Sequence, residues 1–305
     1  MSFLLLQKVN VKIHLISYLL EKSKLAQYKV FMHEFKFVKM NGLGNDFVVI
    51  DQRVSEFDLS EEQIKLICNR TDGVGCDQLI MIRKSQDNSN PLIKFFNSDG
   101  SEIDACGNGS RCVANFLMKE TKSEKINLTT RERTIACEKI DDVTVSVNMG
   151  KPKFKWNEIP LTEDIDPVDI NFSIRDLTLK KPFLVNIGNP HIIFFDDEIE
   201  KYDVESFGSL IENDSLFPEK INVSFAKLKS DDHILLNVWE RGAGKTNACG
   251  TAACATAVAG VEMGVIKNKV TVTLPGGDLE IYYKSSDNII MTGPTEINFT
   301  DKYKL

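Results

Sequence analysis

The sequence predicts an α+β fold of two pseudo-symmetric domains from an internal duplication, each a curved, mostly antiparallel sheet around a central helix. Three observations lead to this prediction. A set of motifs recurs about 143 residues further along the chain, strand-like runs far outnumber helical ones, and no regular strand–helix–strand alternation favours a doubly wound sheet. The chain has 305 residues, of which 42% are hydrophobic, so each domain can bury a core of its own.

The repeat centres on two cysteines that each lie on a turn of small residues. Cys106 lies in NSDGSEIDACGNGSRC, and Cys249 lies in ERGAGKTNACGTAAC, 143 residues later (249 minus 106). Four further pairs keep an offset of 143 or 144 residues: Asn97 with Glu240, Gly150 with Gly293, Asn45 with Asn189, and Gln78 with Asn222. A solenoid would have a shorter period and at least three copies, so the pattern predicts two similar domains.

Three segments follow from the repeat. Residues 1–33 are an N-terminal extension with the spacing of a loosely amphipathic helix, and Met32 offers a second possible start, so a native extension and a non-native upstream start both stay open. Residues 34–152 form the N-terminal domain, which the C-terminal strand continues. Residues 153–305 form the C-terminal domain, because GKPKFKWNEIP carries two prolines and little periodicity.

The elements of the first copy are predicted from local pattern. β-Branched residues in alternation between turn residues predict strands at 48–50, 79–82, 93–96 and 143–147. A helix is predicted over 60–68, capped by Ser60 or Asp58. The runs 109–119 and 252–263 are small and apolar all round, which predicts two buried helices, each directly after one of the two cysteines.

Composition excludes several classes of function. The net charge of −7 and the lack of a long Lys/Arg block argue against a nucleic-acid partner. No apolar run reaches the roughly 20 residues that span a bilayer, so no membrane association is expected. No Cys-x-x-Cys pair occurs among seven cysteines, which argues against a metal site and favours a reducing, cytoplasmic compartment. The five cysteines outside the repeat turns are expected in the core: Cys68, Cys76, Cys112, Cys137 and Cys254.

The two cysteine turns suit acid/base chemistry. A helix start lowers the pKa of a thiol placed on it and binds anions such as carboxylates through its unpaired N–H groups. Two such starts face to face would hold one carboxylate between two thiols. One thiolate could then remove the α-proton while the opposite thiol donates a proton to the other face, which inverts a stereocentre without a cofactor. The alternative interpretation is that both cysteines are simply small buried hydrophobic residues. The matching repeat positions of Cys106 and Cys249 disfavour this alternative.

At these residues the sequence resembles the diaminopimelate epimerase family, cofactor-free two-cysteine epimerases of the lysine and peptidoglycan pathway. The resemblance runs from about Phe35 to the C-terminus. It rests on motifs that occur in order: KMNGLGNDF, GVGCDQL, FFNSDGSEIDACGNGSRC, NIGNPH, ERGAGKTNACGTAAC, LPGG and MTGP. Departures are small, since Thr251-Ala252 stands where the family more usually has Ser-Gly, and Asn41 stands where His is common.

The resemblance implies stereoinversion of LL-2,6-diaminopimelate to the meso form by a homodimeric enzyme that needs no cofactor. Cys106 and Cys249 would exchange the roles of base and acid, while His191 and Glu240 would adjust the pKa of the thiols. Other matched positions would bind the substrate: Asn45, Gln78, Asn97, Gly107, Asn108, Asn189, Asn222, Glu240, Arg241, Gly250 and Thr251. On residue type alone, the Asn residues could be turn formers and His191 a satisfied buried histidine.

Two rival classes stay open on the sequence. One is another cofactor-free isomerase, either proline-racemase-like or phenazine-biosynthesis-like. Glu240 with Arg241 favours a long substrate with a polar group at each end over proline, and the cysteine pair speaks against the phenazine type. The other is a non-catalytic binding protein on the same scaffold, which the intact cysteines disfavour. If the two thiols face each other, an oxidant is expected to join them and inactivate the protein reversibly.

Overall fold

The structure is a computed structural model that describes residues 34–85, 90–104, 106–168, 170, 172–174, 177–178 and 182–305. The predicted extension, 1–33, lies outside the described residues. The described residues divide into a small unit, 34–37 with 301–305, and a large unit, which lies within 38–300. In the small unit, Lys302 pairs with Glu34 at 3.0 Å. The large unit holds both cysteine motifs, and the predicted division at residue 152 stays a prediction.

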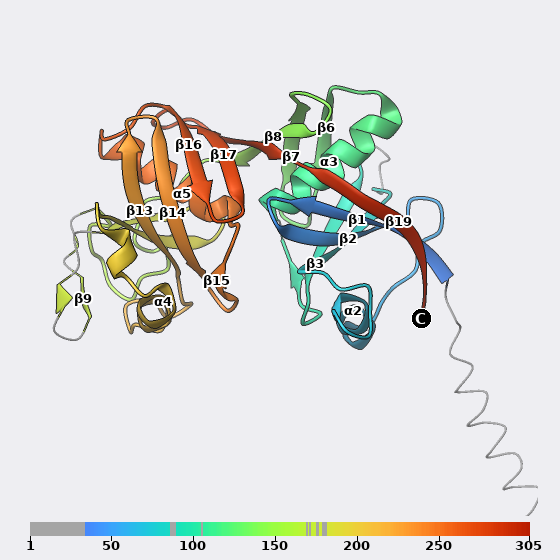
Figure 1. The fold of residues 1–305 in the computed structure, drawn as a ribbon, viewed down its shortest axis with the longest axis horizontal. Coiled ribbons are helices and arrows are strands. Elements are labelled where there is room, and N and C mark those ends of the chain that lie inside the picture. The colour runs from blue at the N-terminus through green and yellow to red at the C-terminus, as the bar shows by residue number, and fades with distance from the viewer. Residues whose placement is uncertain are drawn as a thin grey trace, which may run out of the picture. The chain divides into compact units, whose positions relative to one another are not determined.

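The first copy of the repeat consists of eight described strands and two helices (Figure 1). Its strands are β1 (Glu34–Gly42), β2 (Asn45–Asp51), β3 (Gln78–Arg83), β4 (Leu92–Asn97), β5 (Glu102–Ile103), β6 (Lys125–Thr129), β7 (Thr134–Lys139) and β8 (Thr144–Gly150). Its helices are α2 (Glu61–Cys68) and α3 (Gly107–Thr121).

The second copy has the corresponding elements in the same order. Its strands are β11 (Phe183–Asn186), β12 (Pro190–Phe195), β13 (Asn222–Ser230), β14 (His233–Glu240), β15 (Gly244–Thr246), β16 (Lys269–Leu274), β17 (Gly277–Tyr282) and β18 (Ile289–Pro294). Its helices are η1 (Ile199–Lys201), α4 (Val204–Glu212) and α5 (Gly250–Glu262). A short hairpin, β9 (Ser173–Ile174) with β10 (Leu177–Thr178), lies between the copies, and β19 (Glu296–Lys304) ends the chain.

Strand pairing confirms the duplication. In the first copy β1–β2 is antiparallel, β2–β3 parallel and β3–β4 antiparallel, and β11–β12, β12–β13 and β13–β14 repeat that order. Even the register repeats, because Phe47 lies opposite Gln78 in one copy and His191 opposite Asn222 in the other. The last strands of the copies, β8 and β18, pair with each other in antiparallel fashion.

The sheet is mostly antiparallel, as predicted, but it contains four parallel pairs among the described strands: β2–β3, β4–β6, β12–β13 and β14–β16. Parallel neighbours need a crossover connection. In the sequence order α2 and α4 lie within two of these crossovers, and α3 and α5 lie within the others. The strands are too short for periodicity alone to reveal these crossovers.

The predicted elements are confirmed with shifted ends. Ser60 caps α2 in a complete capping box with Gln63. The helices α3 and α5 begin two residues before the predicted positions, at Gly107 and Gly250, so Cys106 and Cys249 are their N-cap residues. Glycine is a weak helix former, which explains why the pattern placed both starts too late.

Both central helices are buried, as expected for their composition. Helix α3 packs on β6, β7 and β8, and α5 packs on strands of the second copy that include β11, β12, β13 and β17. Small residues permit this close packing: a β-carbon on Gly109 would lie 2.9 Å from Ile80 Cδ1 and 3.0 Å from Phe95 Cε1. The five cysteines predicted for the core are all buried and unpaired by disulfides.

Candidate active site

The two cysteines cap matching helices in nearly the same backbone conformation. Cys106 has φ −131° and ψ 119°, and Cys249 has φ −132° and ψ 104°. The backbone N–H of Gly109 donates to Cys106 Sγ at 3.4 Å. Cys249 makes no cap bond of this kind, and its Sγ lies 3.4 Å from Thr251 Oγ1. The copies thus place equivalent thiols in different hydrogen-bonding environments.

The two helix starts lie against a common side chain, Met291 of β18. A β-carbon on Gly107 would come within 2.7 Å of Met291 Cε, and one on Gly250 within 2.9 Å of Met291 Sδ. The same β-carbon on Gly250 would also lie 2.9 Å from Asn108 Oδ1, which belongs to the other helix. Neither glycine leaves room for a side chain, so the two N-termini approach each other through glycine backbone.

Asn45 links the first helix start to a carboxylate. Its Oδ1 lies 3.9 Å from Cys106 Sγ and accepts from Asn108 Nδ2 at 3.5 Å. Its Nδ2 donates to Asp77 Oδ2 at 2.8 Å. The structure therefore brings the predicted residues Asn45, Cys106 and Asn108 together and adds Asp77, which was not predicted for the site.

Gln78 and Asn97 form a second polar pair in the first copy. They lie opposite each other on β3 and β4, and Gln78 Nε2 donates to Asn97 Oδ1 at 3.1 Å. Asn97 Nδ2 donates in turn to Ser101 Oγ at 3.2 Å. The paired strands explain why two residues 19 positions apart meet.

A hydrogen-bond chain leads from His191 to the thiol of Cys249. His191 Nε2 lies 2.9 Å from Asn189 Oδ1, Asn189 Nδ2 donates to Thr251 Oγ1 at 3.3 Å, and Thr251 Oγ1 lies 3.4 Å from Cys249 Sγ. An amide oxygen only accepts, so His191 carries its proton on Nε2. Burial lowers the pKa of the imidazole to about 3, which keeps it neutral. The chain can therefore direct the Thr251 hydroxyl proton toward the sulfur.

Glu240 also interacts with the Cys249 thiol. Thr246 Oγ1 donates to Glu240 Oε1 at 2.5 Å, and the carboxyl group is hydrogen-bonded with Cys249. Burial raises the pKa of Glu240, with hydrogen bonds from Thr246 and Cys249 opposing that rise. Thr246 was not predicted for the site, because only the β14–β15 hairpin brings it back beside Glu240.

Asn222 and Arg241 contact each other through the backbone. The N–H of Arg241 donates to Asn222 Oδ1 at 3.0 Å, while Asn222 Nδ2 donates to the carbonyl of Pro190 at 2.9 Å. The Arg241 side chain is exposed, and its Nη1 donates to the carbonyl of Glu219 at 2.9 Å. Asn222 thus holds the backbone beside an exposed guanidinium.

The helix starts lower the pKa of both thiols, as expected, but burial acts against them and is the larger effect. Burial raises the pKa of Cys106 to about 11, although the Gly109 amide opposes the rise. Burial, followed by the negative charge of Glu240, raises the pKa of Cys249 well above its usual value. Desolvation of a thiolate therefore outweighs the helix start in both copies.

Several acceptors of the predicted site have no partner. Gln78 Oε1, Asn108 Oδ1 and His191 Nδ1 are buried and make no hydrogen bond. Buried polar atoms are nearly always hydrogen-bonded, so an unpartnered one within a polar site points to a binding or catalytic role. Gln78 Oε1 and Asn108 Oδ1 can accept from N–H donors of a ligand, and the two helix starts can bind its carboxylate.

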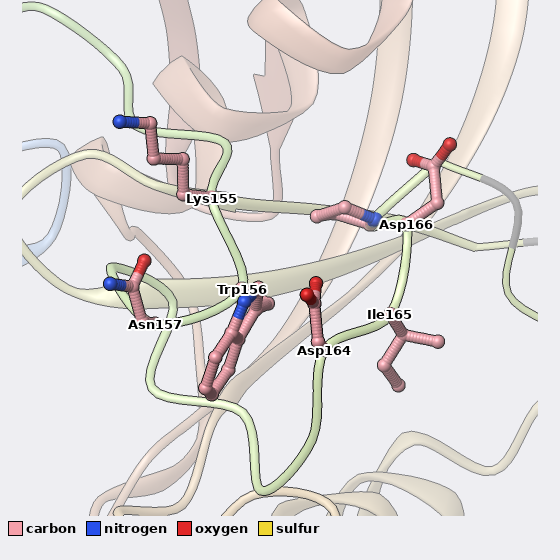
Figure 2. A pocket seen from close by; sticks show the side chains of 7 residues that line it. Lys155, Trp156, Asn157, Asp164, Ile165 and Asp166 are labelled. Atoms are coloured by element: carbon pink, nitrogen blue, oxygen red, sulfur yellow. The ribbon is translucent and has the colours of Figure 1, made fainter.

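Other candidate features lie apart from this site. Figure 2 shows a pocket lined by Lys155, Trp156, Asn157, Asp164, Ile165, Asp166 and Pro167, none of which was predicted for function. Within the described part of the chain, no cluster of three His, Cys, Asp or Glu side chains could hold a metal ion. In the same residues, no helix is long and apolar enough to cross a membrane.

Comparison with known proteins gives a consistent match. The diaminopimelate epimerase family model matches residues 37–155 and 183–298, which correspond to the two copies. The diaminopimelate epimerase of Pelagibacter ubique (strain HTCC1062) is 45% identical over 86% of this chain and 96% of that protein. The diaminopimelate epimerase of Phenylobacterium zucineum (strain HLK1) is 42% identical over 86% of this chain and 95% of that protein.

Solved structures share the fold at low sequence identity. A hydroxyproline epimerase from Agrobacterium vitis, solved with bound trans-4-OH-L-proline, gives a TM-score of 0.64 at 12% identity and covers 89% of this chain and 93% of its own. A phenazine biosynthesis protein of the PhzF family from Enterococcus faecalis gives 0.61 at 15% identity and covers 90% of this chain and 100% of its own. With the repeated topology and the family match over both copies, the chain belongs to the diaminopimelate epimerase family.

Proposed function

We propose that this protein is an isomerase that converts LL-2,6-diaminopimelate to meso-diaminopimelate, a step toward lysine and peptidoglycan precursors. The observation that carries the proposal is the pair of thiols that cap equivalent helices, with both helix starts against Met291. Relatives that are 39–45% identical bear the name diaminopimelate epimerase, which supports this substrate.

The reaction would use Cys106 and Cys249 as its two acid/base residues. One thiolate takes the proton from the α-carbon, and the opposite thiol donates a proton to the other face of the carbanion. The N-termini of α3 and α5 would hold the α-carboxylate and stabilise the negative charge that develops beside it. Gly107-Asn108 and Gly250-Thr251 would supply those backbone donors, and the two glycines let both helix starts lie against Met291.

The raised thiol pKa values require a mechanism for ionising one cysteine. At Cys249, the chain from His191 through Asn189 ends in the Thr251 hydroxyl, which can donate to the thiolate. Glu240 acts in the opposite direction, because its negative charge raises the pKa of this thiol. We assign His191 and Glu240 to opposing roles in setting the ionisation of Cys249.

The far end of the substrate carries an ammonium and a carboxylate group. The carboxyl group of Glu240 and the guanidinium of Arg241 would bind these two groups, and Asn222 holds the Arg241 backbone in place. On the first copy, Asn45, Gln78 and Asn97 offer amide groups, and the unpartnered Gln78 Oε1 can accept from an ammonium group. We further propose a cytoplasmic homodimer that works without a cofactor.

A stereochemical assay tests this function directly. Purified, reduced and dialysed protein is incubated with LL-diaminopimelate, with L-proline in a parallel sample, and the products are separated by chiral chromatography. The expected result is a mixture of LL- and meso-diaminopimelate with proline unchanged. Conversion of proline alone would indicate a proline-racemase-like enzyme, and binding of diaminopimelate without conversion would indicate a binding protein.

A further inference from the structure

Glu212 is a buried carboxylate at the last residue of helix α4, and it contacts the turn that follows strand β14. It is 4% exposed. Trp239 Nε1 donates to its Oε2 at 2.7 Å, and the backbone N–H of Gly242 donates to its Oε1 at 3.0 Å. Burial acts to raise the pKa of Glu212, but these two hydrogen bonds and the charge of Lys220 together hold it below its usual value. The group is therefore an ionised carboxylate, which only accepts hydrogen bonds.

The turn that Glu212 contacts carries Glu240 and Arg241, the two residues proposed to bind the far end of the substrate. The N–H of Ala243 donates to the Glu240 carbonyl at 3.1 Å, so Arg241 and Gly242 are the central residues of a four-residue turn. Gly242 has φ +75°, a conformation that glycine adopts without strain. The hydrogen bond that closes the turn does not involve the N–H groups of Arg241 and Gly242, so these donors need partners from elsewhere.

Buried side chains from two other elements accept from both N–H groups. Gly242 donates to Glu212 of α4 at 3.0 Å, and Arg241 donates to Asn222 Oδ1 of β13, also at 3.0 Å. Asn222 is 3% exposed, so neither acceptor competes freely with water for these donors. The Arg241 side chain is exposed, and its place over the site is set by the backbone that Glu212 and Asn222 hold at adjacent residues.

Close packing fixes helix α4 beside the same turn. The helix packs on β13, β14 and β15. A β-carbon on Gly208, in the middle of α4, would lie 2.4 Å from both Cβ and Cγ of Trp239, so the helix lies against this residue with no room for a side chain. The indole of the same Trp239 donates to Glu212 at the helix end. Glu212 therefore cannot move away from the turn without breaking the contact between α4 and β14.

We propose that Glu212 is a positioning residue for the epimerisation, which fixes this turn so that the guanidinium of Arg241 is preorganised for the far-end carboxylate of the substrate. The inference rests on the proposed function, since that function assigns Arg241 to the substrate. Glu240 has a separate anchor, because Thr246 Oγ1 donates to its carboxyl group at 2.5 Å. Loss of the Glu212 carboxylate should therefore weaken substrate binding more than it slows proton transfer.

Steady-state kinetics with LL-diaminopimelate separate positioning from a general loss of structure. Glu212→Met removes both acceptor oxygens at similar side-chain length, and it is expected to raise KM about tenfold while kcat stays within about threefold of the parent. Partial unfolding would instead lower kcat and leave KM unchanged, because it only reduces the amount of active enzyme. Glu212→Gln keeps one acceptor oxygen, so its KM is expected to return to within about threefold of the parent.

Trp239→Phe is the matched control. It removes the indole N–H from Glu212 but leaves the carboxylate and its bond to Gly242 in place, so KM should stay within about twofold of the parent. An equal rise in KM in Trp239→Phe would attribute the effect to packing of α4 on β14 and overturn the proposal. A folded Glu212→Met variant with the KM of the parent would overturn it as well.

Amide hydrogen exchange tests the same inference without substrate. In ¹⁵N-labelled parent protein, the N–H of Gly242 is expected to be protected, and fast exchange there contradicts the proposal whether or not the variants fold. In Glu212→Met, the N–H groups of Arg241 and Gly242 should exchange about tenfold faster, and in Trp239→Phe at the rate of the parent. A parent that protects the turn but does not convert diaminopimelate would refute the proposed function alone, so the two failures are distinguishable.

Discussion

Replacing Thr251 with valine tests how the thiol of Cys249 is ionised. Valine has nearly the same shape as threonine but lacks the hydroxyl that lies 3.4 Å from Cys249 Sγ and accepts from Asn189 at 3.3 Å. That hydroxyl lowers the pKa of Cys249 against the effect of burial. Its loss should therefore raise the thiol pKa further and reduce the fraction of thiolate at a given pH.

The size of the effect follows from the bond that is lost. A hydrogen bond to a charged group contributes about 1.5–3 kcal/mol, and the long contact to sulfur favours the lower end of that range. About 1.5 kcal/mol corresponds to roughly a tenfold loss in kcat/KM. The assay is kcat/KM for LL-diaminopimelate across pH 6–10, in which the limb that reports thiol ionisation should also move upward by about one unit.

Thr251→Ser is the matched control. Serine keeps the hydroxyl and removes only a methyl group, so this variant should stay within about twofold of the parent at every pH. A Thr251→Val profile that superimposes on the parent would refute the proposed role of the hydroxyl. An equal loss in Thr251→Ser would attribute the effect to packing of the methyl group instead.

Three more predictions concern the same site. Burial lowers the pKa of His191 to about 3, well below its unfolded value of about 6.5. In chemical denaturation, the contribution of His191 to the free energy of unfolding should therefore be fully present above pH 6.5 and fall by about 1.4 kcal/mol per pH unit below it. A His191→Asn variant with the same pH dependence as the parent would contradict this. Glu240→Gln removes a negative charge that raises the pKa of Cys249, so iodoacetamide should alkylate Cys249 faster at pH 8, and unchanged or slower alkylation counts against that role. Gly250→Ala places a methyl group 2.9 Å from Met291 Sδ. This variant should lose at least tenfold in kcat/KM and about 1–3 kcal/mol in the free energy of unfolding. A fully active variant would show that the helix starts need not approach so closely.

The sequence predicts the two-domain fold because the same motifs occur at matching positions in both copies. The offsets of Cys106 with Cys249 and of Gln78 with Asn222 predict the duplication, and the pairing register reproduces it. The parallel crossovers were not predicted, because they depend on which strands pair across a helix. Both helices were predicted to begin two residues too late, because glycine, a weak helix former, occupies the first turn of α3 and α5.

The site is predicted less completely, for physical reasons. Motifs identify the thiols and the amides around them, but the side chain that both helix starts contact, Met291, comes from a strand far along the chain. The sign of the thiol pKa shift depends on burial, which the sequence does not show. Glu212 lies 30 residues before Gly242, and glutamate is usually exposed, so nothing in the pattern indicates a buried carboxylate that holds this turn.

The central claim is that both thiols take part in one proton-transfer reaction. The most direct test is proton NMR of LL-diaminopimelate in deuterated water with the reduced protein, beside Cys106→Ala and Cys249→Ala. The account predicts loss of the α-proton signal with formation of meso product in the parent, and no epimerisation in either variant. Epimerisation at the parent's rate in either variant would contradict the two-thiol mechanism.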